Sequence, residues 1–503
     1  MVSSLVVMAT AALLQQMPCE SLQAATRPRA TITAAEHVAA GAAAPGRGGR
    51  GGAGAPLPAH CRVAVTLTPS SDSHIEMELW LPTANWNGKF LAVGNGGWAG
   101  TISFDAMAAG LRRGYATASN DTGHKGGSAS FALGHPEKLI DFGYRAMHEM
   151  AVQSKALIQT FYRQAPRLSY YQGCSTGGRQ GLMAAQRFPE DFDAIIAGAP
   201  VYNVVHLNVS QVALQVDMLR NRSRLVSAEQ RTTFANAVVA ACDQKDGVKD
   251  GIISEPRACT FDPAVLACRA DASTAPGSTG AASCFSPAQV ENARSAYSPV
   301  KTKGGALVYP PRSPGFESGW RIPVPDAPLN PLFADMVRYV ARQDPTWDPM
   351  TFDLDTDLAL AVKNAGFIEA SDPDLAKFKA RGGKLLLYHG WADPGPAPEN
   401  TINYYDAVNR TLGGREDGWM RLFLMPGVGH CGGGVGPDQA DFLGAVERWR
   451  EQDVAPRQII ATRAAGRGAA SPLSRPLCPH PQVARYTGAG STDDAANFSC
   501  VTP

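Results

Sequence analysis

The hydrophobic positions of the first 200 residues switch between two periods, one typical of strands and one typical of helices. Short runs either alternate apolar with polar residues, as half-buried strands do, or are apolar throughout, as central strands are. These runs predict strands at residues 63–67, 75–82, 89–93, 114–119 and 193–200. A long amphipathic pattern at residues 141–164 predicts a helix. Strands that alternate with helices favour a mostly parallel, doubly wound sheet.

The pattern is interrupted at residues 202–355 and then resumes. The interrupted span has polar helical segments, four cysteines and a stretch rich in proline and glycine around residue 312. The resumed part predicts strands at residues 384–389 and 420–425 and helices at residues 400–408 and 438–451. We therefore expect a core domain made of residues 19–201 and 356–503, with residues 202–355 inserted into it.

Size and charge narrow the classes of protein. A chain of 503 residues exceeds what one core usually holds, which agrees with a domain that carries a large insertion. The formal net charge of +1, without a long run of Lys or Arg, gives no electrostatic reason to expect a nucleic acid or an anionic membrane as partner.

The N-terminal region contains two segments that we expect to lie outside the core. Residues 1–18 begin with a short apolar run that resembles the core of a secretory signal, although the usual basic start is missing; a buried helix is the alternative. Residues 24–59 are rich in Ala, Gly, Arg and Pro and predict a flexible surface connection. No later stretch is apolar for long enough to span a membrane, so a soluble protein is expected.

The cysteines favour an oxidising compartment. Their number is even, they are dispersed, and none has the C-x-x-C spacing of zinc or redox sites, so disulfides in a secreted or periplasmic protein are expected. The plausible local pairs are Cys242 with Cys259, Cys268 with Cys284, and Cys478 with Cys500. Four cysteines then remain to pair among themselves: Cys19, Cys61, Cys174 and Cys431.

Residues 170–179, which follow the predicted helix at residues 141–164, fit a nucleophile elbow. Gly173-x-Ser175-x-Gly177 lies between a strand-like and a helix-like segment, and a further strand follows. In such an elbow a serine occupies a sharp turn, and the glycines leave room for a substrate carbonyl. The pentapeptide alone arises by chance in a chain with 51 glycines, so its strand–turn–helix–strand setting carries the prediction that Ser175 is a nucleophile.

A serine nucleophile needs a base and an orienting acid, which in α/β-hydrolases follow it in the order acid, then histidine. Of the four histidines after Ser175, only His430 lies on a glycine-rich loop after a late strand. Asp393 follows the preceding strand, where the acid is expected. His389 ends that strand, and a structural role is favoured for it; His206 and His480 have no catalytic setting.

Two further features support a hydrolase site. A glycine-rich loop at residues 94–100 follows an early strand, where α/β-hydrolases place one N–H donor of the oxyanion hole; we select Gly97, with Gly96 second, against the alternative of an ordinary turn. Cys174 precedes the nucleophile and Cys431 follows the base, so a bridge between them would tie the two loops together. The expected architecture is an α/β-hydrolase fold in which residues 202–355 form a lid domain.

An acidic turn lies within the lid. Asp243, Asp246 and Asp250, with two glycines among them, stand in a short loop between Cys242 and Cys259. Oxygen ligands on a tight turn suit Ca²⁺. From composition alone a solvated acidic turn is about as plausible as a calcium site.

The chain resembles the tannase and feruloyl esterase family, which also contains mono(hydroxyethyl) terephthalate hydrolases. The motifs that carry the resemblance are at residues 173–179, 390–394 and 426–434, within a match from about Cys61 to Cys500. The family often has bulkier apolar residues where this chain has Gly395-Pro396-Ala397-Pro398, so one wall of the substrate site is expected to differ.

The resemblance implies roles for individual residues. It implies Ser175 as nucleophile, His430 as base and Asp393 as orienting acid, with a Cys174–Cys431 bridge. It also implies that the N–H groups of Thr176 and Gly97 form the oxyanion hole. The structural calcium site of the lid would comprise the side chains of Asp243, Asp246 and Asp250 and the carbonyls of Val248 and Ile252.

These predictions describe a secreted serine esterase that acts on small aromatic esters and needs no organic cofactor. Feruloyl esters are favoured over galloyl or terephthaloyl esters, and the protein is expected to be a monomer or a homodimer. Aromatic and cationic lid residues are candidates for binding the acid, although packing is the commoner role for such residues: Arg312, Phe316, Trp320 and Arg321. A non-catalytic binding protein with this fold would usually lack a triad residue, and a serine peptidase would cleave peptides.

Overall fold

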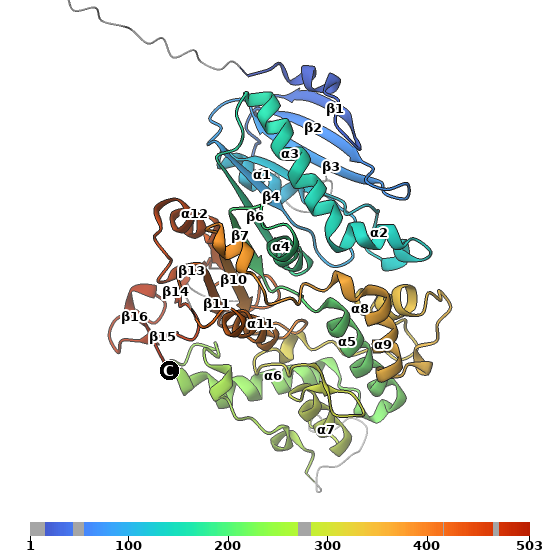
Figure 1. Ribbon diagram of the computed structural model, residues 1–503. Coiled ribbons are helices and arrows are strands. Elements are labelled where there is room, and N and C mark those ends of the chain that lie inside the picture. The colour runs from blue at the N-terminus through green and yellow to red at the C-terminus, as the bar shows by residue number, and fades with distance from the viewer. Residues whose placement is uncertain (1–15, 44–54, 270–282, 416, 466–471) are drawn as a thin grey trace, which may run out of the picture.

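The core of the protein is one mixed, nine-stranded sheet (Figure 1). The computed structural model describes residues 16–43, 55–269, 283–415, 417–465 and 472–503. The strand order is β1-β2-β3-β5-β4-β6-β7-β10-β11, antiparallel from β1 to β5 and parallel from β5 to β11. The strands are β1 (Ala30–Val38), β2 (His60–Leu67), β3 (Ile75–Pro82), β4 (Lys89–Val93), β5 (Ala116–Asn120), β6 (Leu168–Cys174), β7 (Ala194–Gly198), β10 (Lys384–Gly390) and β11 (Met420–Met425). The α/β-hydrolase fold expected from the sequence is confirmed.

Helices cover both faces of the sheet, because successive strand residues point to opposite sides. In β6, Tyr171 packs into one hydrophobic cluster together with α3 and α4, whereas its neighbour Tyr170 packs into another together with α1 and α12. The helices of the core domain are α1 (Phe104–Arg112), α2 (Pro136–Ile140), α3 (Ala146–Tyr162), α4 (Thr176–Arg187), α10 (Ala376–Ala380), α11 (Pro398–Thr411) and α12 (Phe442–Gln452). The long helix expected at residues 141–164 begins with a π-helical turn at Asp141–Arg145, and α3 follows it.

The expected linker at residues 24–59 is wrong in part, because Ala30–Val38 form the edge strand β1. This strand pairs antiparallel with β2 and buries Ile32. The Cys19–Cys61 bridge joins the segment before β1 to β2. Residues 1–15 and 44–54, which include most of the signal-like segment, lie outside the described residues.

The inserted lid occupies the chain between β7 and β10, although these two strands pair with each other in parallel. Its elements are α5 (Val204–Arg220), α6 (Ala228–Cys242), α7 (Pro287–Ala296), α8 (Pro331–Asp335) and α9 (Leu354–Ala365), with the short strands β8 (Val300–Lys301) and β9 (Leu307–Tyr309). The boundary expected at residue 355 falls inside α9, and Ala361 and Ala365 of this helix pack in the same cluster as α5 and α8. The lid therefore extends to about Ile368.

All five disulfides are formed. The three local pairs are confirmed, and the remaining cysteines pair as Cys19–Cys61 and Cys174–Cys431. The C-terminal part adds two small sheets, made of β12 (Gln439–Ala440), β13 (Ile459–Arg463) and β14 (Leu473–Leu477), and of β15 (Val483–Tyr486) and β16 (Phe498–Val501). Within the described part of the chain, no helix is both long and apolar enough to cross a bilayer.

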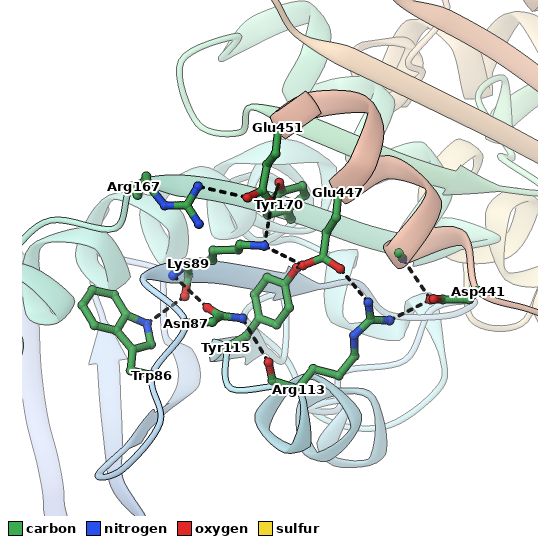
Figure 2. A network of polar contacts seen from close by, with 11 residues as sticks. Trp86, Asn87, Lys89, Arg113, Tyr115, Arg167, Tyr170, Asp441, Glu447 and Glu451 are labelled. Atoms are coloured by element: carbon green, nitrogen blue, oxygen red, sulfur yellow. Dashed lines mark hydrogen bonds and ion pairs between the residues drawn. The ribbon is translucent and has the colours of Figure 1, made fainter. Parts of the chain in front are cut away.

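A polar network fixes α12 against the sheet (Figure 2). Lys89, at the start of β4, contacts the carboxylates of Glu447 and Glu451 on α12. The hydroxyl groups of Tyr115 and Tyr170 donate hydrogen bonds to the same two carboxylates. Because Lys89 is only 9% exposed, its charge is compensated within the protein rather than by water. The network thus holds α12, and with it one end of the loop that joins β11 to α12.

One buried acid in the lid predicts a pH-dependent stability. Glu317 is 1% exposed and accepts hydrogen bonds from the Gly315 N–H and the Tyr297 hydroxyl. Burial raises its pKa from 4.5 to about 7. Between these values the unfolded chain has already lost the proton that the folded lid retains. The free energy of unfolding should therefore fall as pH rises from about 4.5 to 7, by roughly 3 kcal/mol.

Thermal unfolding across this pH range measures the effect. Glu317→Gln cannot titrate, so its unfolding temperature should lack this fall. Glu229→Gln, at an exposed position on α6, is the matched control and should follow the wild-type curve. Parallel curves for the wild type and Glu317→Gln would show that Glu317 does not titrate here.

Candidate active site

Ser175 lies on the sharp turn between β6 and α4, as the elbow pattern predicts. Its backbone has φ 62° and ψ −124°, a conformation that L residues rarely adopt. Two hydrogen bonds hold the turn, one from the Ser175 N–H to the Gly198 carbonyl and one from the Arg179 N–H to the Ser175 carbonyl. A Cβ atom on Gly173 would lie 2.6 Å from the backbone of Gly177, so this close turn requires glycine.

The acid and base candidates come from the ends of adjacent parallel strands. Asp393 follows β10, His430 follows β11, and the His430 Nδ1 lies 2.6 Å from the Asp393 Oδ2. Facing a carboxylate, Nδ1 carries the proton and donates, which leaves Nε2 as the acceptor. The Cys174–Cys431 bridge, with Cα atoms 5.9 Å apart, links the nucleophile turn to the base loop.

The Asp393 carboxyl is fully buried, yet it is kept ionised. Burial alone would raise its pKa, but the adjacent His430 and His389 rings more than offset burial and lower the pKa to about 2. The carboxylate is therefore charged throughout the usual pH range and can stabilise a protonated His430.

His389 contacts the same carboxylate oxygen, a contact that sequence analysis missed. Its Nε2 faces the Asp393 carboxylate and, at 3.1 Å, the Pro396 carbonyl, which both only accept, so Nε2 carries the proton and Nδ1 accepts from the Thr401 hydroxyl at 2.7 Å. This Nε2 lies 3.1 Å from the Asp393 Oδ2. The ring is fully buried, which agrees with the structural role expected for it. The signal available in the sequence was the spacing of four residues between His389 and Asp393.

A narrow cavity of about 50 Å³ brings the nucleophile, the base and both oxyanion-hole candidates together. Ser175, Thr176, Gly97 and His430 all line it. The Thr176 hydroxyl donates a hydrogen bond of 2.9 Å to the Gly97 carbonyl, which links the two oxyanion-hole candidates. Gly97 has φ +56°, whereas Gly96, the second candidate, does not line the cavity.

The cavity walls are mainly apolar and come from distant parts of the chain. Trp98 and Phe142 belong to the core domain, and Phe333 comes from α8 of the lid. Gly395 and Pro396, for which the resemblance led us to expect a different wall, also line the cavity. No pattern in the sequence indicates that these aromatic residues converge, because they are far apart in the chain and also fit ordinary packing.

Two polar side chains complete the walls. Arg321 is exposed, lines the cavity, and lies over the Phe333 ring with 5.7 Å from its guanidinium carbon to the ring centre. Asn208 on α5 is 4% exposed and also lines the cavity. Sequence analysis missed Asn208, since a single amide in a helix carries no motif.

Three of the four lid candidates for substrate binding do not line the cavity, so that prediction is wrong for them. Phe316 and Trp320 are buried in the second cluster of the lid, with α6 and α7. The Arg312 guanidinium is buried and donates hydrogen bonds to the Pro394 carbonyl and the Gln211 side chain. It therefore supports the loop after Asp393, and only Arg321 reaches the site.

In the acidic turn of the lid, the aspartate side chains accept hydrogen bonds from backbone N–H groups of the same turn. Asp243 accepts from the N–H groups of Asp250 and Gly251, and Asp246 accepts from that of Val248. Asp250 pairs with Arg475. Within the described residues, no three His, Cys, Asp or Glu side chains gather around one point as a metal site requires. Carboxylate oxygens are nevertheless the kind of ligand that Ca²⁺ prefers. Asp243 and Asp246 are each 6% exposed.

Comparison with known proteins assigns the family. The model of the family described as tannase and feruloyl esterase matches residues 61–501. The chain is 37% identical to an uncharacterised esterase of Xanthomonas campestris, over 96% of this chain and 91% of that protein, and 35% identical to feruloyl esterase C of Talaromyces stipitatus, over 88% and 85%. The crystal structure of feruloyl esterase B from Aspergillus oryzae superposes with a TM-score of 0.86 at 32% identity, covering 96% of this chain and 99% of that one. The chain belongs to the tannase and feruloyl esterase family.

Proposed function

We propose that the protein is a serine carboxylic-ester hydrolase that cleaves esters of aromatic acids, with feruloyl esters favoured. One observation carries the proposal: Ser175, His430 and both oxyanion-hole candidates line a single cavity whose walls are mainly apolar and include Trp98, Phe142 and Phe333. The relatives named feruloyl esterases support the choice of acid. The five disulfides favour an oxidising compartment, so we place the protein outside the cytoplasm, secreted or periplasmic.

Acylation begins at the Ser175 hydroxyl. Its oxygen attacks the ester carbonyl carbon while the His430 Nε2 takes the proton, and the Asp393 carboxylate stabilises the imidazolium that forms. The carbonyl oxygen becomes an anion that accepts hydrogen bonds from the N–H groups of Gly97 and Thr176. Such a donor contributes about 3–4 kcal/mol to transition-state stabilisation in comparable enzymes.

Collapse of this intermediate releases the alcohol. The His430 imidazolium gives its proton to the alcohol oxygen as the bond to the acyl carbon breaks, which leaves an ester on Ser175. Water then attacks this acyl-enzyme while His430 takes a proton from it, and His430 returns that proton to the Ser175 oxygen. The acid is released and the site is restored.

The cavity walls suit a planar aromatic acyl group. Trp98, Phe142 and Phe333 offer apolar and aromatic surface to the ring. The Asn208 amide and the Arg321 guanidinium can then contact a polar substituent, either a phenol hydroxyl or a carboxylate. An analogue that lacks this substituent would leave the polar groups of the site without a partner, so the site should strongly reject it.

Hydrolysis of three esters tests the proposal. Methyl ferulate, methyl gallate and mono(hydroxyethyl) terephthalate are assayed with the wild type, and Ser175→Ala serves as blank. Preferred turnover of the ferulate supports the feruloyl assignment, whereas preference for either other ester assigns that acid instead. Cleavage of a short nitrophenyl ester alone would contradict aromatic-acid specificity and leave the triad standing.

We also propose that the acidic turn of the lid binds a structural Ca²⁺. Asp243, Asp246 and Asp250 would supply carboxylate oxygens, and the carbonyls of Val248 and Ile252 would complete the site. Burial raises the pKa of Asp246 and Asp250, so both carboxylates lie in surroundings that a bound cation would make more favourable. The ion would brace the lid and take no part in the reaction.

Removal of calcium should lower the thermal stability of the lid. At a Ca²⁺ concentration 100 times the dissociation constant, binding stabilises the folded state by about 2.7 kcal/mol, so chelation should lower the unfolding temperature by several degrees. The variant with Asp243→Asn and Asp246→Asn should show the same temperature with and without Ca²⁺. Asp262→Asn, an exposed acid of the lid, should keep the wild-type response. An unchanged wild-type temperature after chelation would contradict the site.

A further inference from the structure

The Arg179 side chain is buried beside the nucleophile turn, and it takes no part in the reaction described above. It lies on α4, four residues after Ser175, and is fully buried. Among the described residues, no carboxylate pairs with it. Burial lowers the pKa of Arg179 to about 10, so its guanidinium stays charged at neutral pH. Because a buried cation without an anionic partner costs free energy, its contacts need a physical explanation.

Backbone carbonyls from two separate segments take the place of a counter-ion. The first segment is the π-helical turn before α3, where the Phe142 and Gly143 carbonyls accept hydrogen bonds of 3.1 and 2.8 Å from the guanidinium. The second is the end of the lid, where the Ile368 carbonyl accepts at 3.0 Å. The guanidinium carbon also lies 4.9 Å from the centre of the Phe142 ring, over its face. Arg179 thus joins the nucleophile helix to both segments.

Both segments adjoin the cavity at Ser175. The Phe142 ring forms part of its wall and stacks on Trp98, another wall residue, with the ring centres 4.9 Å apart. Ile368 packs in the same hydrophobic cluster as these two rings. A displacement of either segment would therefore move the aromatic wall. The nucleophile turn would keep its hydrogen bond from the Arg179 N–H to the Ser175 carbonyl, because that bond does not involve the side chain.

We propose that Arg179 is a positioning residue that fixes the aromatic wall of the cavity and thereby sets the preference for aromatic acyl groups. This inference rests on the proposed esterase function. A methionine of similar length would fill the same space without the cost of burying a charge. It could not hold carbonyls of two segments at once, because that requires the several N–H donors of a guanidinium. Arg179 does not line the cavity, so it acts through Phe142.

The relative activity on two esters tests this role. One ester contains the preferred aromatic acid and the other contains acetic acid, and both contain the same alcohol. Arg179→Met should lower kcat/KM for the aromatic ester about tenfold, mainly through KM, because the wall binds the ring in the ground state and the transition state alike. The value for the acetyl ester, whose acyl group has no ring, should change less than about threefold. Equal losses on both esters, or no loss on either, would overturn the proposal.

Arg187→Met is the matched control. Arg187 is an exposed residue of the same helix, its guanidinium carbon lies 4.4 Å from the centre of the Tyr144 ring, and it donates to the Phe367 carbonyl at 3.5 Å. It therefore contacts the same two segments as Arg179, but Tyr144 does not line the cavity. The control should keep the wild-type ratio of the two activities. A fall as large as that in Arg179→Met would contradict a specific role for Arg179.

A double-mutant cycle tests whether Arg179 acts through Phe142. Phe142→Leu removes the ring and keeps an apolar side chain, so it should lower the ratio of aromatic to acetyl activity. In that background Arg179→Met should lower the ratio by less than about a further twofold, because the ring that it positions is gone. Losses that multiply would overturn the proposal, and so would an unchanged ratio in Phe142→Leu. Lysine offers its charge at a single point and cannot span both segments, so Arg179→Lys replaces Arg179→Met if the latter does not fold.

Hydrogen exchange separates this inference from the proposed function. Amide exchange of residues 141–146 and 366–370, measured by mass spectrometry, requires no ester. It should become faster in both segments when the Arg179 side chain is replaced, because the hydrogen bonds that hold them to α4 are lost. Unchanged exchange would overturn the positioning role. A wild type that cleaved the acetyl ester as well as the aromatic one would instead overturn the proposed preference for aromatic acids.

Discussion

Replacement of Ser175 by alanine is expected to lower kcat for ester hydrolysis by about 10⁶-fold, the loss seen when a serine nucleophile is removed from a comparable triad. The variant keeps the oxyanion-hole donors and the cavity, so a weak residual rate above the reaction in water should remain. Because alanine removes one oxygen atom from a partly exposed position, the fold should not change.

The measurement is kcat with the preferred aromatic ester, together with the mass of the protein during turnover of a slow ester. Wild type should gain the mass of the acyl group on the peptide that contains Ser175, and the variant should not. Ser130→Ala, at an exposed position, is the control and should behave as wild type. Activity above about one per cent in a folded Ser175→Ala protein would place the nucleophile elsewhere.

Replacement of Asp393 by asparagine should lower kcat by about 10⁴-fold. The Asp393 carboxylate accepts from His430 at 2.6 Å and holds the proton on Nδ1, which leaves Nε2 able to act as base. An asparagine amide can turn its NH₂ group towards Nδ1 and so stabilise the other tautomer, in which Nε2 already carries a proton. Its loss of charge also removes the stabilisation of the imidazolium.

Kinetics should show a larger effect on kcat than on KM, since Asp393 does not line the cavity at Ser175. Asp438→Asn is the matched control, because Asp438 also accepts a hydrogen bond within the base loop, from the Gly433 N–H. It should retain activity close to that of the wild type. A larger loss in Asp438→Asn than in Asp393→Asn would reject Asp393 as the orienting acid.

The sequence was informative wherever the signal is local. The nucleophile turn is a run of five residues, and the loops of Asp393 and His430 each follow a strand whose apolar run is plain. The order of these three elements along the chain then predicted which ones meet. The local disulfides were predictable for the same reason, because a short loop limits the possible partners.

The sequence was least informative where a contact joins distant segments or where burial decides the role. Phe316 and Trp320 look like ligand-binding residues in a polar segment, yet both are buried within the lid. Residues 30–38 contain no Gly, Arg or Pro, and the prediction of a linker there comes only from the residues around them, which are rich in these; residues 30–38 pair with β2 as a strand. The walls of the cavity at Ser175 combine residues from several distant segments, and no pattern in one segment records such convergence.

The position of the lid also has a consequence for how the protein is made. β7 and β10 are neighbours in the sheet, but residues 199–383 separate them, so a growing chain displays β7 with an unpaired edge until the whole lid has been synthesised. At 5–20 residues per second this interval lasts roughly 10–40 s. The Asp393 and His430 loops are synthesised later still, so Ser175 has no acid and no base beside it until they are made. The catalytic centre thus cannot form until residue 430 has been made, and a chain released between the end of the lid and residue 430 would have a complete lid and no means of catalysis.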